Sequence, residues 1–137
     1  MSTLDIQERR IDGVSVLDLD GDIRMGGGNI TLQKAIRCLT DEGRNQVVLN
    51  LARVNFIDSS GLGELISGHV LLNKKGGRIK LINLTRRLLE LMTLTKLNTV
   101  FDIYDEELEA LDSFKMLDAV AVAIAPPGKV ETIIASP

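Results

Sequence analysis

The sequence predicts an α/β protein with a mixed sheet of four to five strands and about four helices. Near the N-terminus, two apolar runs are joined by Asp12-Gly13, a dipeptide typical of a tight hairpin turn. After this hairpin, runs rich in Val, Ile and Leu alternate with longer segments whose apolar residues recur at helical spacing. A strand, helix, strand unit crosses over right-handedly and makes its two strands parallel, so we expect a hairpin followed by parallel strands.

Length, composition and charge are those of one globular domain with a hydrophobic core. The chain has 137 residues, of which 45% are hydrophobic, and a formal net charge of −3. Its basic residues occur as isolated pairs, so we expect no direct binding to nucleic acid. The single cysteine, Cys38, excludes an internal disulfide and is expected to be a small packing residue. The lone His69 excludes the usual zinc spacings, and no metal or cofactor is predicted.

Neither a secretion signal nor a membrane span is expected. The N-terminus turns polar before an apolar stretch develops. The longest apolar run, residues 119–125, is far shorter than the ~20 residues that span a bilayer. We therefore expect a cytoplasmic protein that does not contact a membrane.

The first two strands are expected at residues 4–11 and 14–19. In the second, Val16 lies on one face and Leu17 and Leu19 on the other, which indicates a strand covered on both faces. The glycine-rich residues 21–29 follow as a loop. Neither Lys-Ser, Lys-Thr nor the dinucleotide spacing accompanies these glycines, so a flexible connection is preferred to a phosphate-binding loop.

A first long helix is expected from about residue 29 or 30 to Asp41, because apolar residues recur there on one stripe. The stripe consists of Leu32, Ala35, Ile36 and Leu39. A short buried strand is then expected at residues 46–51, which are rich in β-branched side chains. This strand should lie parallel to the strand at residues 14–19.

The loops that follow these two parallel strands leave the same edge of the sheet. Open α/β sheets place their sites at the carboxyl ends of the strands. We therefore expect Asp22 and Arg24, from the first loop, to lie near Asp58 and Ser59, from the second.

The segment Asp58-Ser59-Ser60-Gly61-Leu62-Gly63 joins the second loop to a helix predicted by Leu62, Leu65, Ile66, His69 and Leu72. A carboxylate and two hydroxyls at a helix start are ordinarily N-caps. The two glycines exceed what a cap needs, because each weakens a helix by roughly 0.5–1 kcal/mol relative to alanine. They also leave bare backbone beside the hydroxyls, which would admit a phosphate or another macromolecule at the positive end of the helix. From these residues alone, both interpretations remain open.

The second half of the chain predicts a strand at residues 78–84, a helix at 85–96, a short strand at 100–103 and a helix that opens with Asp105-Glu106-Glu107. In the helix at 85–96 some leucines do not fit the core stripe. They are Leu89 and Leu94, with Leu97 just beyond. These side chains are either tucked under another element or offered to a partner.

The motif at residues 58–63, in its strand-to-helix context, resembles the signature of the STAS domain family. Its form with Asp followed by Ser is similar to that of the bacterial anti-sigma factor antagonists. The resemblance covers about residues 3–111 as a STAS domain and leaves 112–137 as a C-terminal extension. That extension is either a helix continuation with a tail, or a segment that pairs with another chain or covers a hydrophobic face.

The resemblance implies a phosphorylation-gated binding switch that regulates transcription. In this family, the unphosphorylated protein binds an anti-sigma factor, which is itself a serine kinase, and frees the sigma factor. The family's phosphorylated serine corresponds to Ser59, and a PP2C-type phosphatase opposes the kinase. The residues implied in partner binding are Asp22, Arg24, Asp58, Ser60, Gly61, Leu62 and Gly63. Self-association through the C-terminal extension is a further expectation.

One position departs from the family pattern, because the family often carries Asp where Arg24 stands. Either Asp22 takes over the acidic role, or Arg24 alters how the kinase docks or how the phosphate is held. This departure and the extension motivate an alternative function, a non-phosphorylated STAS interaction module of a transporter-associated subunit or larger signalling assembly. An enzyme is the weakest alternative, because His69 lies on the apolar stripe of its helix and no nucleophile with an orienting pair can be assembled.

Overall fold

An antiparallel hairpin of β1 (Leu4–Ile11) and β2 (Val14–Ile23) begins the computed structural model, which describes residues 4–124. The two turn residues, Asp12 and Gly13, have φ angles of 51° and 80°. Positive φ at both central residues is what a type I′ hairpin turn requires, and Asp-Gly is one of the dipeptides that tolerate it. The predicted hairpin is therefore confirmed.

The sheet continues with β3 (Gln46–Ile57), β4 (Arg78–Ile82) and β5 (Asp102–Tyr104), so that the strand order is β1-β2-β3-β4-β5. Each of the last three strands is parallel to its neighbour. The prediction of a mixed sheet, with a hairpin followed by parallel strands, is confirmed.

Two strands are longer than the sequence indicated. β2 runs to Ile23 and β3 to Ile57, because they pair with each other along their whole length. The residues from Gly21 to Ile23 are thus strand, where we had expected a loop. The pairing register shifts twice in this part, between Asp18 and Asp20 and between Gly21 and Ile23. Such bulges interrupt the regular alternation of apolar and polar residues from which strand ends are read in a sequence.

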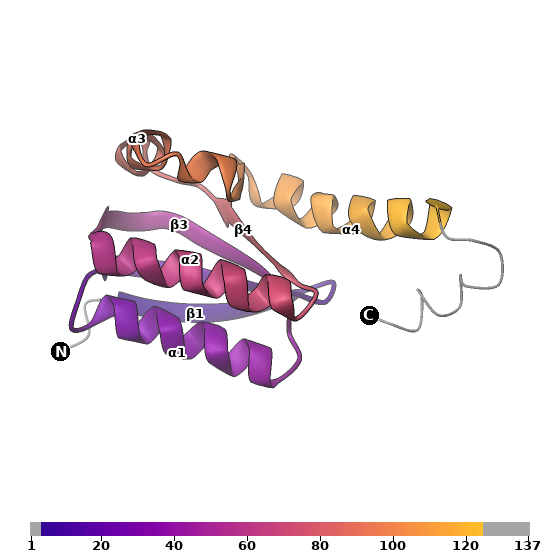
Figure 1. Cartoon of the computed structure of the whole chain (residues 1–137), viewed down its shortest axis with the longest axis horizontal. Coiled ribbons are helices and arrows are strands. Elements are labelled where there is room, and N and C mark those ends of the chain that lie inside the picture. The colour runs from indigo at the N-terminus through magenta and orange to yellow at the C-terminus, as the bar shows by residue number, and fades with distance from the viewer. Residues whose placement is uncertain (1–3, 125–137) are drawn as a thin grey trace.

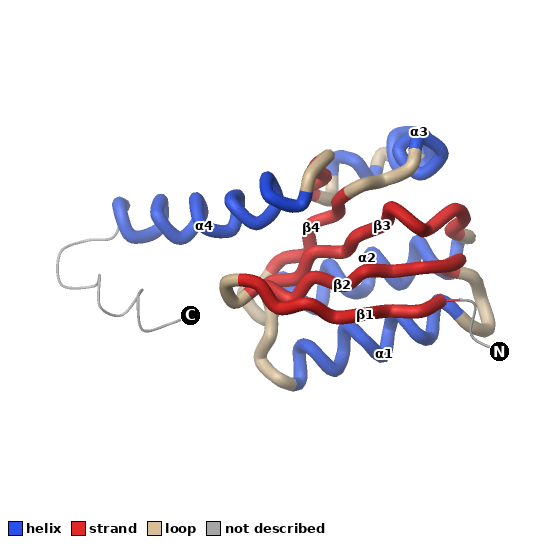
Figure 2. Tube along the Cα trace, turned by 180° about the vertical axis from the view of Figure 1, so that it is seen from behind, coloured by secondary structure: helices blue, strands red, loops and turns tan. Residues whose placement is uncertain are grey.

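Four helices pack on this sheet (Figures 1 and 2). α1 (Gly28–Asp41) and α2 (Ser59–Lys74) lie side by side on one face, as the view in Figure 2 shows from the strand side. α3 (Arg86–Leu94) contacts β3 and is followed by a 3₁₀ turn (Leu97–Thr99). α4 (Glu107–Ile124) packs on the face opposite to α1 and α2. None of the helices within residues 4–124 has the length and hydropathy needed to cross a membrane.

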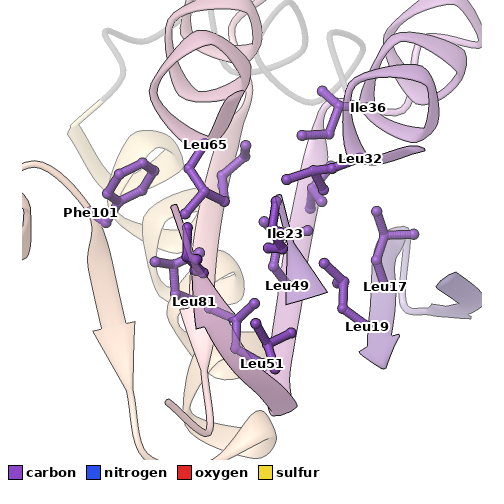
Figure 3. Close-up of a cluster of buried hydrophobic side chains, with 14 of the residues drawn as sticks. Leu17, Leu19, Ile23, Leu32, Ile36, Leu49, Leu51, Leu65, Leu81 and Phe101 are labelled. Atoms are coloured by element: carbon purple, nitrogen blue, oxygen red, sulfur yellow. The ribbon is translucent and has the colours of Figure 1, made fainter. Parts of the chain in front are cut away.

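The main core fills the space between the sheet and the helices α1 and α2 (Figure 3). Residues from β2 and β3 that point into it alternate with residues that point to the other face. Among its members are Leu17, Leu19, Ile23, Leu32, Ile36, Leu49, Leu51, Leu65, Leu81 and Phe101. A second, smaller cluster under α4 contains Val14, Val16, Val48, Ile82, Ala110, Leu111 and Phe114. β2 is therefore covered on both faces, as predicted.

α4 is held on the sheet by ionic contacts as well as by apolar ones. Arg9 of β1 binds both Asp18 and Glu107, the first residue of α4. Lys80 is almost fully buried, with Nζ 4.7 Å from the centroid of the Phe114 ring and 3.6 Å from a carboxylate oxygen of Asp102. The helix continues from residue 112 to 124 without a break, so the expected start of the extension falls inside α4. Residues 125–137 lie outside the described part of the chain.

Two further expectations are wrong, and one open question is answered. The last strand begins at Asp102 instead of residue 100, because the 3₁₀ turn occupies the preceding residues and leaves Val100 exposed. Cys38 is exposed on α1 and does not pack in the core. Of the three leucines outside the core stripe, Leu94 of α3 is 82% exposed and Leu89 is 38% exposed, whereas Leu97 packs against the main core, so both of the alternatives left open by the sequence occur.

Candidate functional site

The candidate site lies where β2 and β3 end side by side. Ile23 and Ile57, the last residues of these strands, are register partners, and the backbone N–H of Asp58 donates to the carbonyl of Ile23 across 3.3 Å. The loop that leads from β2 to α1 therefore touches the start of α2. This is the juxtaposition of Asp22 and Arg24 with Asp58 and Ser59 that the parallel strands predicted.

The Asp58 carboxylate joins the loop to the helix. Its Oδ1 accepts a hydrogen bond from the backbone N–H of Gly61, at 2.9 Å, which makes Asp58 the N-cap of α2. Its Oδ2 accepts from the backbone N–H of Met25, also at 2.9 Å. These two hydrogen bonds, with Met25 the larger influence, hold the pKa of the Asp58 carboxyl below its usual range, and the charge of Arg24 adds to the effect.

The N-cap of α2 does not use the hydroxyl of Ser59 or Ser60, because the Asp58 carboxylate supplies the cap. Ser59 is the first residue of α2 and is exposed, whereas Ser60 is half-buried. The Ser59 hydroxyl thus stands at the positive end of a helix of 16 residues. A negatively charged group attached there would meet backbone N–H groups instead of carbonyl oxygens.

The two glycines of the motif differ in what surrounds them. Gly61 is buried, and a Cβ on it would lie 2.3 Å from the carbonyl oxygen of Ile23, so only glycine lets α2 approach β2 this closely. Gly63 is exposed, and nothing lies within 4 Å of the position that its Cβ would take. Leu62, between them, is half-buried and packs against the main core. Gly61 and Leu62 therefore seat the helix, while Gly63 presents bare backbone to solvent.

Arg24 lies over an aromatic ring at the rim of the site. Its guanidinium carbon is 4.0 Å from the centroid of the Phe56 ring, and its Nε donates to a carboxylate oxygen of Asp22 across 3.1 Å. About half of the Arg24 side chain remains exposed. Asp22 and Arg24 therefore form an ion pair beside the start of α2. The sequence left open which of these two side chains acts at the site, and the structure places both of them there.

Sequence reasoning missed two residues of this site, Met25 and Phe56. Met25 contributes its backbone N–H, for which a side-chain pattern contains no signal, and its side chain is 74% exposed. Phe56 lies two residues before the motif and was assigned no role. As one of three phenylalanines in the chain, placed on an exposed position next to the serines, it could have been recognised as a surface aromatic.

Exposed apolar side chains occur on both helices that follow the loops of the site. Ile30, at the start of α1, and Ile66, on α2, are 45% and 38% exposed. Between α1 and α2 runs a shallow cavity of about 140 Å³, lined by Gln33, Ile36, Arg37, Glu64, Ser67, Gly68 and Leu71. The neighbouring surfaces of α1 and α2 therefore combine exposed apolar side chains with charged ones such as Arg37 and Glu64.

His69 lies away from the exposed serine and is part of the packing of α2. Its ring centroid is 5.0 Å from that of Phe101, and Nε2 is 3.2 Å from the side-chain nitrogen of Asn73. This agrees with a packed histidine, as expected from its position on the apolar stripe. Within residues 4–124, no group of three or more His, Cys, Asp or Glu side chains is arranged to hold a metal ion.

The mixed sheet, with an exposed serine at the start of the helix that follows β3, defines the class of protein. The STAS domain family model matches residues 5–110, and the chain belongs to this family.

Within the family, this chain is similar to named antagonists of anti-sigma factors. It is 25% identical over 114 residues to the anti-sigma F factor antagonist of Paenibacillus polymyxa, an alignment that covers 83% of this chain and 97% of the relative. It is 30% identical over 87 residues to the anti-sigma-B factor antagonist of Bacillus subtilis, covering 64% of this chain and 78% of that protein.

A solved structure shows the same fold. The crystal structure of an anti-sigma factor antagonist from Mycobacterium paratuberculosis matches with a TM-score of 0.69 at 28% sequence identity. The match covers 82% of this chain and 97% of the other.

Proposed function

We propose that this protein is an anti-sigma factor antagonist whose binding to an anti-sigma factor is gated by phosphorylation of Ser59. The observation that carries the proposal is the exposed serine at the first position of α2, beside an aspartate that already caps the helix. The similarity to two named antagonists, at 25% and 30% identity, supports the class of partner.

In the unmodified state, the partner docks on the surface around Ser59. Gly63 lets the partner's backbone come close, because its neighbourhood is open. The exposed apolar side chains of Met25, Ile30 and Ile66 supply area that can be removed from water on binding. Asp22, Arg24 and Ser60 lie at the rim, while Gly61 and Leu62 act from below by seating α2. The anti-sigma factor held in this way releases its sigma factor, which regulates transcription.

Phosphorylation reverses this binding. The anti-sigma factor, acting as a serine kinase, transfers the terminal phosphoryl group of ATP to the Ser59 oxygen. A new O–P bond forms, the bond to the leaving ADP breaks, and the hydroxyl proton passes to a base of the kinase. The phosphate adds about −1.5 to −2 charge at pH 7 beside Asp58 and Asp22. An interface that must bury this charge is disfavoured, so the partner leaves. A PP2C-type phosphatase restores the serine by hydrolysis.

Substitutions at Ser59 test the gate. We expect Ser59→Ala to bind the anti-sigma factor as tightly as the unmodified protein and Ser59→Asp to bind it at least tenfold more weakly, which corresponds to about 1.4 kcal/mol. The measurement is isothermal titration calorimetry with the purified anti-sigma factor. Asn98→Asp is the control, since it adds the same charge at an exposed position of the 3₁₀ turn, outside the proposed docking surface, and it should bind as tightly as the unmodified protein. Equal affinity of Ser59→Ala and Ser59→Asp would contradict the proposal.

Mass spectrometry of the protein from its own cells, before and after phosphatase treatment, tests the modification itself. A phosphate on Ser59 is the expected result. Its absence across several growth conditions, together with stable co-purification of a partner that is not a kinase, would favour the alternative of a constitutive interaction module in a transporter-associated or larger signalling assembly.

A further inference from the structure

We propose that Arg24 is the side chain that binds the phosphate on Ser59, by moving from the Phe56 ring to the phosphate oxygens. This inference deepens the proposed function and rests on it only for the existence of the phosphate. Arg24 contacts the Phe56 ring in the unmodified protein and holds the phosphate only in the phosphorylated state.

The first support is the placement of Arg24 relative to the helix start. Arg24 follows Ile23, whose register partner is Ile57, so Arg24 and Asp58 leave neighbouring strands at the same level of the sheet. The next loop residue, Met25, is hydrogen-bonded to the Asp58 carboxylate. Ser59 follows directly. The loop therefore carries the longest basic side chain of its stretch to the immediate surroundings of the phosphate acceptor.

The second support is what the guanidinium offers. The hydrogen bond from Arg24 to Asp22 uses Nε, so this contact does not occupy the two terminal nitrogens of the guanidinium. A guanidinium has five N–H donors in a planar fork that matches a phosphate. Arg24 can thus turn its terminal nitrogens toward the phosphate while Nε stays near Asp22. The Arg24 charge also makes a small contribution to the lowered pKa of the Asp58 carboxyl, as expected for a guanidinium near the start of α2.

The third support is that the contact Arg24 gives up, the one with the Phe56 ring, is weak. An exposed cation over an aromatic ring is one of the weaker contacts in water, and the exposed pair with Asp22, which Nε can keep, does little to hold the guanidinium over the ring. Both the Arg24 and Asp22 side chains are partly exposed, at 51% and 32%. A phosphate carries up to twice the charge of a carboxylate and three acceptor oxygens, and such charge-assisted bonds are the stronger ones. The phosphate therefore outcompetes Phe56 for the guanidinium.

The consequence is that phosphorylation changes shape as well as charge. When Arg24 turns to the phosphate, the Phe56 ring, which it covers in the unmodified protein, becomes bare. Part of the new negative charge is neutralised within the molecule, and the phosphate oxygens are shielded from a phosphatase. Other groups that face this position, Asp22 and Asp58, are acidic and cannot perform this role.

The test uses the full chain with phosphoserine incorporated at position 59 during synthesis, so it does not depend on any cellular kinase. The readout is the second pKa of the phosphate, followed by ³¹P NMR, which is ordinarily near 6. An Arg24→Ala variant should raise this pKa by about 0.2–0.7 of a pH unit, the size expected when an exposed ion pair is lost. Arg24→Lys should fall between, because it keeps the charge and loses the fork.

Arg53→Ala is the matched control. It removes the same charge from an exposed arginine of β3, whose nearest carboxylate oxygen on Asp20 is 3.6 Å away. We expect it to leave the phosphate pKa unchanged. In the chain without substitutions, the ¹⁵N resonance of the Arg24 Nε should shift when phosphoserine replaces serine at position 59. This measurement does not depend on whether a substituted variant folds.

The inference is overturned if Arg24→Ala leaves the phosphate pKa unchanged, if Arg53→Ala shifts it equally, or if the Nε resonance does not move. These outcomes are separate from failure of the proposed function, which would show as binding to the anti-sigma factor that is independent of the state of Ser59.

Discussion

At the scale of single residues, Asp58 does most to shape the candidate site. Its two carboxylate oxygens bind two backbone N–H groups from different segments, Met25 of the loop and Gly61 of α2. Either bond alone would be a local cap or a loop contact. Because one carboxylate makes both bonds, it fixes the position of the loop that carries Arg24 relative to the helix start that carries Ser59.

The charge of Asp58 makes a testable contribution to stability that depends on pH. Its pKa is lowered in the folded protein, mainly by the Met25 N–H. A lowered pKa stabilises the fold above the unfolded value of about 3.9, and this contribution is lost as the pH falls through the folded value. An Asp58→Asn variant, which keeps an oxygen acceptor for capping, should be less stable than the parent at pH 7 and should lose less stability on acidification.

Urea midpoints measured from pH 7 to about pH 3 check this expectation. The pKa of Asp18 is also lowered, chiefly by Arg9, but this group is present in both proteins and cancels in the comparison. Parallel midpoint curves for the parent and the Asn variant would contradict the role assigned to the Asp58 charge.

At the scale of elements, the seating of α2 on β2 decides where the serines are presented. The two glycines of the motif make a matched pair for testing this. Gly61→Ala should destabilise the protein by about 1–3 kcal/mol, because a Cβ would lie 2.3 Å from the Ile23 carbonyl oxygen and the helix must move away. Gly63→Ala should stabilise it by about 0.5–1 kcal/mol, because alanine fits a helix better and the space is open.

The two variants are compared by guanidinium unfolding followed by circular dichroism. The opposite signs are the essential result, since both variants make the same chemical change two residues apart. Destabilisation of the same size in both would show that the loss arises from the motif in general and not from the close approach of α2 to β2.

At the scale of the whole molecule, Ser59 lies on the surface of a fold whose core does not include it. The main core and the cluster under α4 are built from other residues, and Ser59 itself is exposed. We therefore expect the chain with phosphoserine at position 59 to unfold within about 1 kcal/mol of the unmodified chain, because a negative charge at a helix N-terminus contributes only about 0.3–1 kcal/mol. The denaturant dependence should be unchanged.

Paired unfolding curves and ¹H–¹⁵N spectra of the two forms provide the measurement. Spectral changes should be confined to the loop after β2, Phe56 and the first turns of α2. Changes spread across β1 or α4 would mean that phosphorylation acts by remodelling the fold, which is contrary to the proposed gate.

The sequence by itself determined the class of fold and the location of the motif. Asp12-Gly13 predicts the hairpin because few dipeptides accept two positive φ angles, and the confirmed helix from residue 28 to 41 follows from the spacing of its apolar stripe. The parallel order of β2 and β3 then brings Asp22 and Arg24 to the motif. These predictions rest on local rules of backbone conformation, apolar periodicity and crossover handedness, which can be read from the sequence without knowing the contacts between distant elements.

Only the tertiary structure decided which atoms do what within the site. That Asp58 caps both the loop and the helix, that Arg24 lies on Phe56 and that Gly61 is buried while Gly63 is open all depend on distances between β2, β3 and α2. The same holds for the length of β2 and β3, which pairing extends past two register shifts. A sequence pattern reports which face a residue occupies, whereas hydrogen bonds and close approaches are set by the register and spacing of elements that are distant along the chain.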